Sequence, residues 1–506
     1  MRQIEPVLSS EPTTVMSWAR RSKRLLVVVD SAMGEPPCYD VFRRNRLGRS
    51  PGVSMLKAIV SLLLPLVTLT TALNTAAAFA STSSTPVNRA NLSRNRSDTA
   101  GSTGERIAAL EALLSKDPKA GTRWLQLGSV YLRRAFETGD PALYPLAQRS
   151  LSRANQLLGS IPEVLSEQTT LALARHQFEE ARVVNLLLLK QRPLSVEGRV
   201  ARFDVVVELG SYAEAQTLIE ELVDQKVGTA TLARLSYIKQ LLGDSAGSEE
   251  AMRSAVGAAP KNSFDRAVAL GYLGDILLEN GKLDASSRAY ENALLIAPTL
   301  SDALLGEARI AMARGQTLKA VERIDRLNER MPTPGGLGFR ADIARSLGDR
   351  KAMGAANELV DVTVALFQAS GSVVDSELAV LLADRGAIGS KKAIETAKRA
   401  YEDRQTIFTA DALAWSLFSS GRLREADKYA KEAIRTEPIV SSVRWHAAAI
   451  FAAVGNEKSA RKEMQAAARN PWFSPSQRPA ILALAKKLGV VVPSGSALAN
   501  VRKALA

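Results

Sequence analysis

From residue 103 onward, apolar residues recur at the three- and four-residue spacing of amphipathic helices. Ala and Leu are frequent, aromatic residues make up only 5% of the chain, and the alternation typical of strands is scarce after residue 80. This pattern predicts an all-α protein. At 506 residues the chain is too long for one hydrophobic core, so we expect either several domains or a repeat array.

Glycines and prolines interrupt the helical segments at nearly regular intervals. The prolines are Pro162, Pro193, Pro260, Pro298, Pro332 and Pro438. The glycines are Gly210, Gly243, Gly281, Gly315, Gly348, Gly386, Gly421 and Gly455. A glycine suits the turn from a first helix into a second, and a proline cannot continue the second helix. The pattern therefore predicts helical hairpins with a period of about 34 residues.

Within these units the residues resemble the tetratricopeptide repeat, whose signature is W-x-x-L-G-x-x-Y, then A-x-x-x-F, then a proline. One unit carries Trp124, Leu127, Gly128 and Tyr131 at that spacing. Two more carry Leu270, Leu273, Gly274, Leu277, Ser286, Tyr290, Ala293 and Pro298, and Leu413, Ala414, Leu417, Ala426, Ala430, Ala433 and Pro438. The resemblance covers about 370 residues and implies a right-handed α-solenoid, a TPR superhelix of about ten hairpins over residues 121 to 471.

Two further helices, at about 104–116 and 475–488, are expected to cap the ends of the stack. The first unit is lengthened between Phe136 and Pro145, and the stretch 334–404 departs from the pattern. We expect the superhelix to bend or loosen there. The succession TGDPALY, ALAWSLFSSGR and NPWFSP is similar to a group of exported bacterial repeat proteins to which no chemistry is assigned.

The region before the repeats reads as an export signal. Residues 55–80 begin with Met55 and Lys57, continue as an apolar run and end with small residues where a signal peptidase cleaves. The predicted cleavage residues are Ala78, Ala80 and Ser81, with Ser81 the first residue of the mature chain. The apolar run is shorter than a spanning helix needs, which favours cleavage over anchoring. The alternative is a retained anchor with the repeats outside.

The other boundaries follow from composition. Residues 1–54 have no sustained periodicity and are expected to be disordered or a mis-assigned extension ahead of a start at Met55. Residues 81–102 are rich in Ser, Thr and Asn, which predicts a flexible linker. The solenoid is then predicted over 103–490, with a short tail at 491–506. The expected location is the periplasm, the cell surface or outside the cell.

Residues suited to catalysis or metal binding are scarce. The single cysteine, Cys38, precedes the signal segment, and the only histidines are His176 and His446. These counts remove the usual thiolate and imidazole ligands, and no nucleophile, base and orienting group occur together. We therefore expect no enzyme activity, no cofactor and no metal.

The candidate partner-binding residues lie on one predicted first helix and its successor. Phe408, Asp411, Trp415 and Phe418 form a second stripe beside the apolar core positions, and Trp445 lies on the next first helix. The resemblance to tetratricopeptide arrays puts such positions in a concave groove, where aromatic residues anchor a protein or peptide partner. The alternative is that Trp415 and Trp445 pack between adjacent first helices.

A second function class is the binding of nucleic acid or another anionic polymer. The net charge is +14, and helical repeats of this length can read RNA. Acidic residues are interspersed through the repeats, among them Glu220, Glu221, Glu249 and Glu250. Together with the export signal they favour a non-catalytic protein-binding scaffold without a nucleic-acid partner. Membrane contact is then expected only through an uncleaved signal segment.

Overall fold

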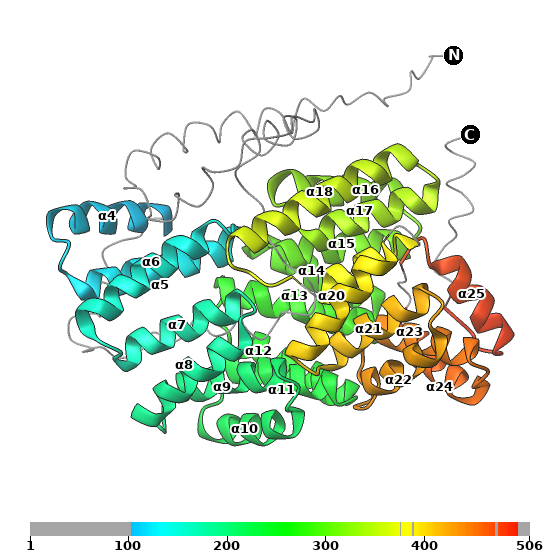
Figure 1. The fold of residues 1–506 in the computed structure, drawn as a ribbon, viewed down its shortest axis with the longest axis horizontal. Coiled ribbons are helices and arrows are strands. Elements are labelled where there is room, and N and C mark those ends of the chain that lie inside the picture. The colour runs from blue at the N-terminus through cyan, green and yellow to red at the C-terminus, as the bar shows by residue number, and fades with distance from the viewer. Residues whose placement is uncertain (1–102, 375, 387–388, 471–473, 494–506) are drawn as a thin grey trace, which may run out of the picture. The chain divides into compact units, whose positions relative to one another are not determined.

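A computed structural model describes residues 103–374, 376–386, 389–470 and 474–493. Within these ranges the chain forms helices and no strand, which confirms the predicted all-helical class. All of these residues belong to the unit Val67–Ala506. Figure 1 shows their helices, labelled from α4 to α25.

The described helices pair into ten consecutive hairpins, the number that the repeat pattern predicts. The first helices are α5 (Gly121–Thr138), α7 (Pro162–Ala174), α9 (Val196–Glu208), α11 (Thr229–Leu241), α13 (Phe264–Glu279), α15 (Ser301–Ala313), α17 (Pro334–Leu347), α19 (Ser376–Ala383), α21 (Ile407–Ser419) and α23 (Ser441–Ala453). The second helices are α6 (Leu143–Leu158), α8 (Phe178–Gln191), α10 (Tyr212–Gln225), α12 (Ser245–Ala258), α14 (Leu283–Ile296), α16 (Thr317–Arg330), α18 (Arg350–Ala369), α20 (Ser390–Asp403), α22 (Leu423–Ala433) and α24 (Glu457–Ala467). Helices α4 (Thr103–Lys116) and α25 (Arg478–Lys487) flank them.

Left-handed residues make the turns inside the hairpins. Every glycine predicted to turn a first helix into a second has positive φ, from 72° at Gly315 to 84° at Gly210. In the α7–α8 turn that place belongs to His176, whose φ is 59°. A residue with a side chain is strained in this conformation, so glycine is the most favourable residue for the turn. The regular spacing of these glycines is therefore what makes the repeat detectable in the sequence.

First and second helices differ in how far they are buried. In α21, ten of 13 residues are buried, whereas only three of 11 are buried in α22. Those three are Ala426, Ala430 and Ala433, at most 1% exposed, where small side chains let the two helices approach closely. Second helices therefore carry the exposed surface, and first helices pack on nearly all sides.

The stretch 334–404 is the least regular part of the array, as its sequence predicts. Helix α18 is extended to 20 residues and α19 is shortened to eight. The hairpin order is nevertheless kept, because α17 pairs with α18 and α19 with α20.

Hairpins far apart in the sequence touch each other. Arg404, just before α21, forms an ion pair with Glu208 at the end of α9, and the Nη1 and Oε2 atoms are 2.5 Å apart. These residues are 196 positions apart. The carbonyl oxygen of Gln405 lies against Gly210, where an added Cβ would be only 2.6 Å from it. No local pattern in the sequence predicted these contacts.

The same relationship recurs along the array. An added Cβ at Gly243 would lie 2.7 Å from the carbonyl of Glu437, and one at Gly281 would lie 2.6 Å from the carbonyl of Arg469. Three successive hairpin turns thus each dock on a loop that precedes or follows a later hairpin. The first half of the array is therefore held against the second half through backbone contacts.

The turn of the α7–α8 hairpin makes a fourth contact of this kind. Val373 donates its backbone N–H to the carbonyl of Arg175 at 2.9 Å, and its own carbonyl accepts from the Nδ1 of His176 at 3.0 Å. Burial lowers the pKa of His176 to about 4, with a smaller contribution from the charge of Arg404, so the ring is neutral at physiological pH.

Some expectations concern residues outside this description. The predicted extension at 1–54, signal at 55–80 with Ala78, Ala80 and Ser81, and linker at 81–102 all lie there, as does most of the predicted tail at 491–506. In the part of the chain that the structure describes, no helix combines the length and hydropathy needed to cross a bilayer.

Candidate functional site

Helix α21 carries four of the five predicted partner-binding residues. Its start is fixed by Thr406, whose side chain accepts a hydrogen bond from the backbone N–H of Thr409, and Thr409 caps Thr406 in return. The helix ends before Gly421, whose φ of 76° begins the turn into α22. These local signals set which faces of α21 meet its neighbours α19 and α23.

Trp415 lies in the packing between these first helices. Its side chain is 7% exposed, and its indole N–H donates to Oδ1 of Asp384 at 2.8 Å. On the ring faces it stacks with His446 from α23, at a centroid distance of 4.0 Å, and with Phe418, at 5.2 Å. The indole is therefore fixed by both stacking and a hydrogen bond.

Asp411 and His446 form a buried pair beneath the indole. Nδ1 of His446 lies 3.0 Å from both carboxylate oxygens of Asp411, and the two residues are 4% and 7% exposed. A carboxylate accepts hydrogen bonds only, so Nδ1 carries the proton and donates it. This pair joins α21 to α23 and holds the imidazole parallel to Trp415.

A second chain of hydrogen bonds reaches the end of the array. The indole N–H of Trp445 donates to Oε1 of Gln477 at 3.0 Å, and Nε2 of Gln477 donates to Oδ1 of Asp384 at 2.9 Å. Burial raises the pKa of Asp384, although its hydrogen bond from Trp415 opposes the rise. Asp384 thus ties both tryptophans to one carboxylate.

The structure brings four of the five candidates together and separates one. Asp411, Trp415, Phe418 and Trp445 meet in this cluster, whereas Phe408 packs near Tyr212 in another hydrophobic cluster. We expected the stripe of Phe408, Asp411, Trp415 and Phe418 to lie outside a core that the other face of the helix already completes. For Trp415 and Trp445, which are 7% and 5% exposed, the structure agrees instead with the alternative, that they pack between adjacent first helices.

Phe418 stays partly exposed, whereas Trp415 and Trp445 are buried. It backs directly onto Trp415 at the end of α21. Contact of any of these residues with a partner stays a prediction.

Sequence reasoning missed three members of the cluster. It gave His446 no site role and did not single out Asp384 or Gln477. The available signal was the repeat period: the three hydrogen-bonded pairs are 35, 31 and 32 residues apart, close to one hairpin. A polar residue one period from a first-helix Trp or Asp is therefore a candidate partner for it.

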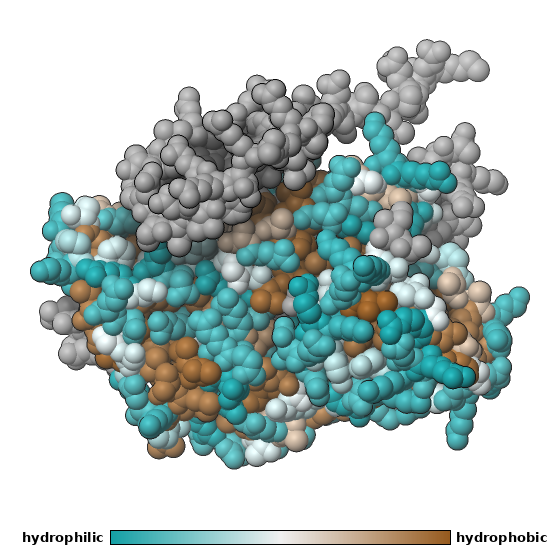
Figure 2. All heavy atoms as spheres, viewed as in Figure 1, coloured by the Kyte–Doolittle hydropathy of each residue, from teal (hydrophilic) through white to brown (hydrophobic). Residues whose placement is uncertain are grey.

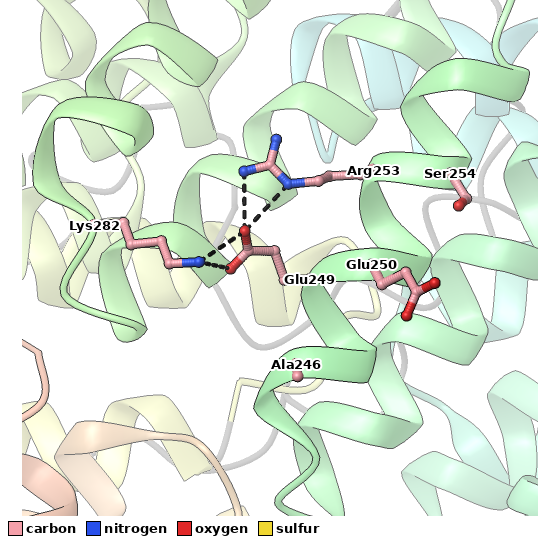
Figure 3. Close-up of a pocket in the computed structure, with 6 residues that line it drawn as sticks. All are labelled: Ala246, Glu249, Glu250, Arg253, Ser254 and Lys282. Carbon is pink, nitrogen blue, oxygen red and sulfur yellow. Dashed lines mark hydrogen bonds and ion pairs between the residues drawn. The ribbon is translucent and has the colours of Figure 1, made fainter.

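A separate pocket lies on the exposed side of α12 and the start of α14. It has a volume of about 530 Å³ and is lined by Ala246, Glu249, Glu250, Arg253, Ser254 and Lys282 (Figure 3). Burial raises the pKa of Glu249, but hydrogen bonds from Lys282, Arg253 and Asn280 outweigh it and bring the pKa below its ordinary value. The two cations of the pocket, Arg253 and Lys282, are thus already paired with Glu249, a carboxylate of the pocket wall.

Metal ligation finds no support in the part of the chain that the structure describes. No group of three or more His, Cys, Asp or Glu side chains there is arranged to hold an ion. The buried Asp411–His446 pair orients aromatic rings, and its stacked position leaves the imidazole only 4% exposed. Chemically, the Asp411–His446 pair can fix the geometry of the surface around it.

Comparison with known proteins identifies the repeat. Residues 412–475 match the family model described as "Tetratricopeptide repeat", and this match includes most of the Trp415 cluster. This segment therefore carries the tetratricopeptide repeat that the sequence motifs predicted. No curated protein matches the chain.

Several solved structures are similar at low identity. A tetratricopeptide repeat protein from Parabacteroides merdae is 18% identical, over 54% of this chain and 98% of that one, with a TM-score of 0.31. Yeast Tom70 is 12% identical, over 79% and 94%, with a TM-score of 0.34. A human IFIT1 dimer with PPP-AAAA is 14% identical, over 65% and 77%, with a TM-score of 0.40. At these scores the likenesses carry no argument about function.

Proposed function

We propose that this protein is an exported, non-catalytic scaffold that binds a protein partner at the accessible edge of the Trp415 cluster. Tetratricopeptide repeats typically mediate protein–protein interaction, and residues 412–475, which match that repeat, lie in an array of ten helical hairpins in the described chain. The observation that carries the proposal is the position of Phe418, a partly exposed ring stacked on a tryptophan that is itself immobilised. Rigid aromatic residues at a surface are the usual anchors of a protein interface.

The cluster also suggests what the partner presents. The rings of Phe418 and Trp415 are nearly parallel, at 25°, so a partner side chain can extend the stack without reorganising it. An extended segment with an apolar or aromatic anchor fits this surface. The Asp411–His446 pair lies behind the rings and serves to hold them, which is a structural role.

Binding of nucleic acid is the weaker alternative. It needs a continuous stripe of unpaired cations. On α9, Arg199 pairs with Glu221 and Arg202 pairs with Glu214, at 2.5 and 2.7 Å. Such pairing breaks up the positive surface that a phosphate backbone would require.

Export rests on the segment 55–80. N-terminal sequencing of the mature protein from the exporting cell tests it directly, and the expected first residue is Ser81. A mature protein that retains residues 55–80 would contradict cleavage, and a protein found only in the cytoplasm would contradict export.

Site-specific cross-linking tests the partner-binding surface. A photoreactive residue at position 418 should capture a discrete partner in cells, whereas one at position 429 should not. Tyr429 is a matched control because it is also a partly buried aromatic residue in the same hairpin, packed against Tyr401 at 5.1 Å.

Affinity for that partner then gives the quantitative test. Phe418→Ala should weaken binding by about tenfold or more, and Tyr429→Ala should not, at similar melting temperatures. Equal cross-linking at both positions, or unchanged affinity in Phe418→Ala, would overturn the proposed surface.

A further inference from the structure

Helix α8 exposes apolar side chains on the face turned away from its hairpin. Val183, Leu186 and Leu187 are 52%, 44% and 48% exposed, and Leu194 just beyond the helix is 85% exposed. Figure 2 shows a hydrophobic patch over the position that Figure 1 gives to α8. The buried face of the same helix, which includes Ala181 and Leu188, already packs into the array.

The positions of Val183 and Leu186 are polar in most other second helices. Ala181 corresponds to Ala426 of α22, because each donates its N–H to the residue immediately before its helix. In that register Val183 and Leu186 correspond to Lys428 and Lys431. The matching pairs elsewhere are Thr217 and Glu220 in α10, Glu250 and Arg253 in α12, Arg288 and Glu291 in α14, Glu322 and Asp325 in α16, Glu395 and Lys398 in α20, and Lys462 and Gln465 in α24. Helix α18 departs from this pattern, with Ala355 and Glu358 at these positions and Leu359, 41% exposed, at the position of Leu187. The repeat fold does not require apolar residues there, so the α8 face needs another explanation.

The face of α8 is also complementary to itself. About Asn185 as centre, Val183 and Leu187 lie two residues to either side, and Glu180 and Lys190 lie five residues to either side. Asn185 itself is buried on the opposite side of α8, where it donates to the carbonyl of Gly198. Two antiparallel copies of α8, related by a two-fold axis that passes the outer face at the level of Asn185, therefore place Val183 against Leu187 and Glu180 against Lys190. In the described part of the chain, Glu180 and Lys190 are exposed and form no ion pair of their own.

We propose that the outer face of α8 is a self-association surface, on which a second copy of this chain docks antiparallel through an isologous contact. Closed two-fold interfaces of this kind are the commonest in homo-oligomers, and each residue pair occurs twice in them. The central apolar side chains lose water, and the four charged side chains at the ends fix the direction of docking. A contact built on one helix is at the small end of protein interfaces, so we expect a dissociation constant on the order of 10 µM.

Sedimentation velocity of the full chain tests the proposal over about 1 to 200 µM. A monomer–dimer equilibrium is expected, and Leu186→Glu should weaken dimerisation at least about tenfold, because the new charges lie near the two-fold axis. Leu295→Glu is the matched control: Leu295 lies in the last turn of α14, is 81% exposed, and is outside the α8 surface. A chain that stays monomeric, or a dimer unaffected by Leu186→Glu, would overturn the proposal.

A charge exchange tests the antiparallel geometry. Glu180→Lys and Lys190→Glu should each weaken the dimer, since each places like charges together twice. The double variant restores both pairs across the axis and should recover most of the affinity, while thermal melting checks that every variant is folded. If the double variant is as weak as the worse single variant, the antiparallel arrangement is wrong. Capture of a different protein by a cross-linker at position 186, with no self-capture, would also contradict it.

Discussion

Nδ1 of His446 lies 3.0 Å from both carboxylate oxygens of Asp411, which stands one repeat earlier on the preceding first helix. The imidazole that this contact fixes lies 4.0 Å from the Trp415 ring, centroid to centroid. The Asp411–His446 pair, which joins neighbouring repeats, thereby makes the aromatic stripe of α21 part of the packing between helices. This relationship decides how substitutions in the cluster are expected to behave.

Trp415→Ala should destabilise the protein strongly. The substitution removes a ring that is 7% exposed, the stacking on His446 and a hydrogen bond to Asp384, and such truncations cost about 3 to 5 kcal/mol. Urea denaturation followed by circular dichroism measures the cost. Phe418→Ala, at the exposed edge of the cluster, is the comparison and should cost clearly less. A Trp415→Ala protein of unchanged stability but impaired partner binding would mean that the ring serves binding and not packing.

The sequence predicted the hairpins well because their signals are local. Glycines with positive φ mark the turns, and alanines such as Ala426 mark the close approach of the two helices. The cluster at Trp415 was predicted only in part, since stacking between repeats depends on the angle between adjacent hairpins. Contacts such as Arg404 with Glu208 depend on the summed rotation over many hairpins, which no local pattern contains.

Glu377 should make stability depend on pH. Burial raises the pKa of this α19 carboxyl from 4.5 to about 8, and the charge of Arg309 only partly opposes the rise. The folded state then binds more protons than the unfolded state between these pH values, so this contribution is full below pH 4.5 and is lost as the pH rises through about 8.

The pH dependence can be measured on a neutral variant. Glu377→Gln should flatten the fall in the free energy of unfolding between pH 5 and 8.5 and should raise stability at the upper end. Glu358→Gln, at an exposed position on α18, is the control and should leave the pH profile unchanged. If the wild-type and Glu377→Gln profiles run parallel, Glu377 is ionised at neutral pH in the folded protein.

Ala426→Leu should overpack the α21–α22 crossing. The site is fully buried, and insertion of a larger side chain into such packing costs about 1 to 3 kcal/mol. Hydrogen exchange should rise first in α21 and α22, because repeat arrays are stabilised by each hairpin and its neighbours. A uniform loss of protection over all described hairpins would instead show that the array unfolds as a single cooperative unit.

The contact between distant hairpins can be tested with two glycines of nearly identical conformation. Gly210 and Gly421 have φ values of 84° and 76°, so alanine at either position costs about 1 to 2 kcal/mol in backbone strain alone. At Gly421 an added Cβ meets nothing within 4 Å, whereas at Gly210 it would lie 2.6 Å from the carbonyl oxygen of Gln405.

Gly210→Ala must therefore also push the loop before α21 away from the α9–α10 turn. We expect it to cost at least about 1 kcal/mol more than Gly421→Ala, in line with the cost of overpacking. For Gly210→Ala, hydrogen exchange should rise on both sides of the contact, in the α9–α10 turn and at residues 405–410, although they are far apart in the sequence. Gly421→Ala should leave exchange in the α9–α10 turn unchanged. Equal destabilisation by the two substitutions, with no change at residues 405–410, would show that these hairpins do not support each other in solution.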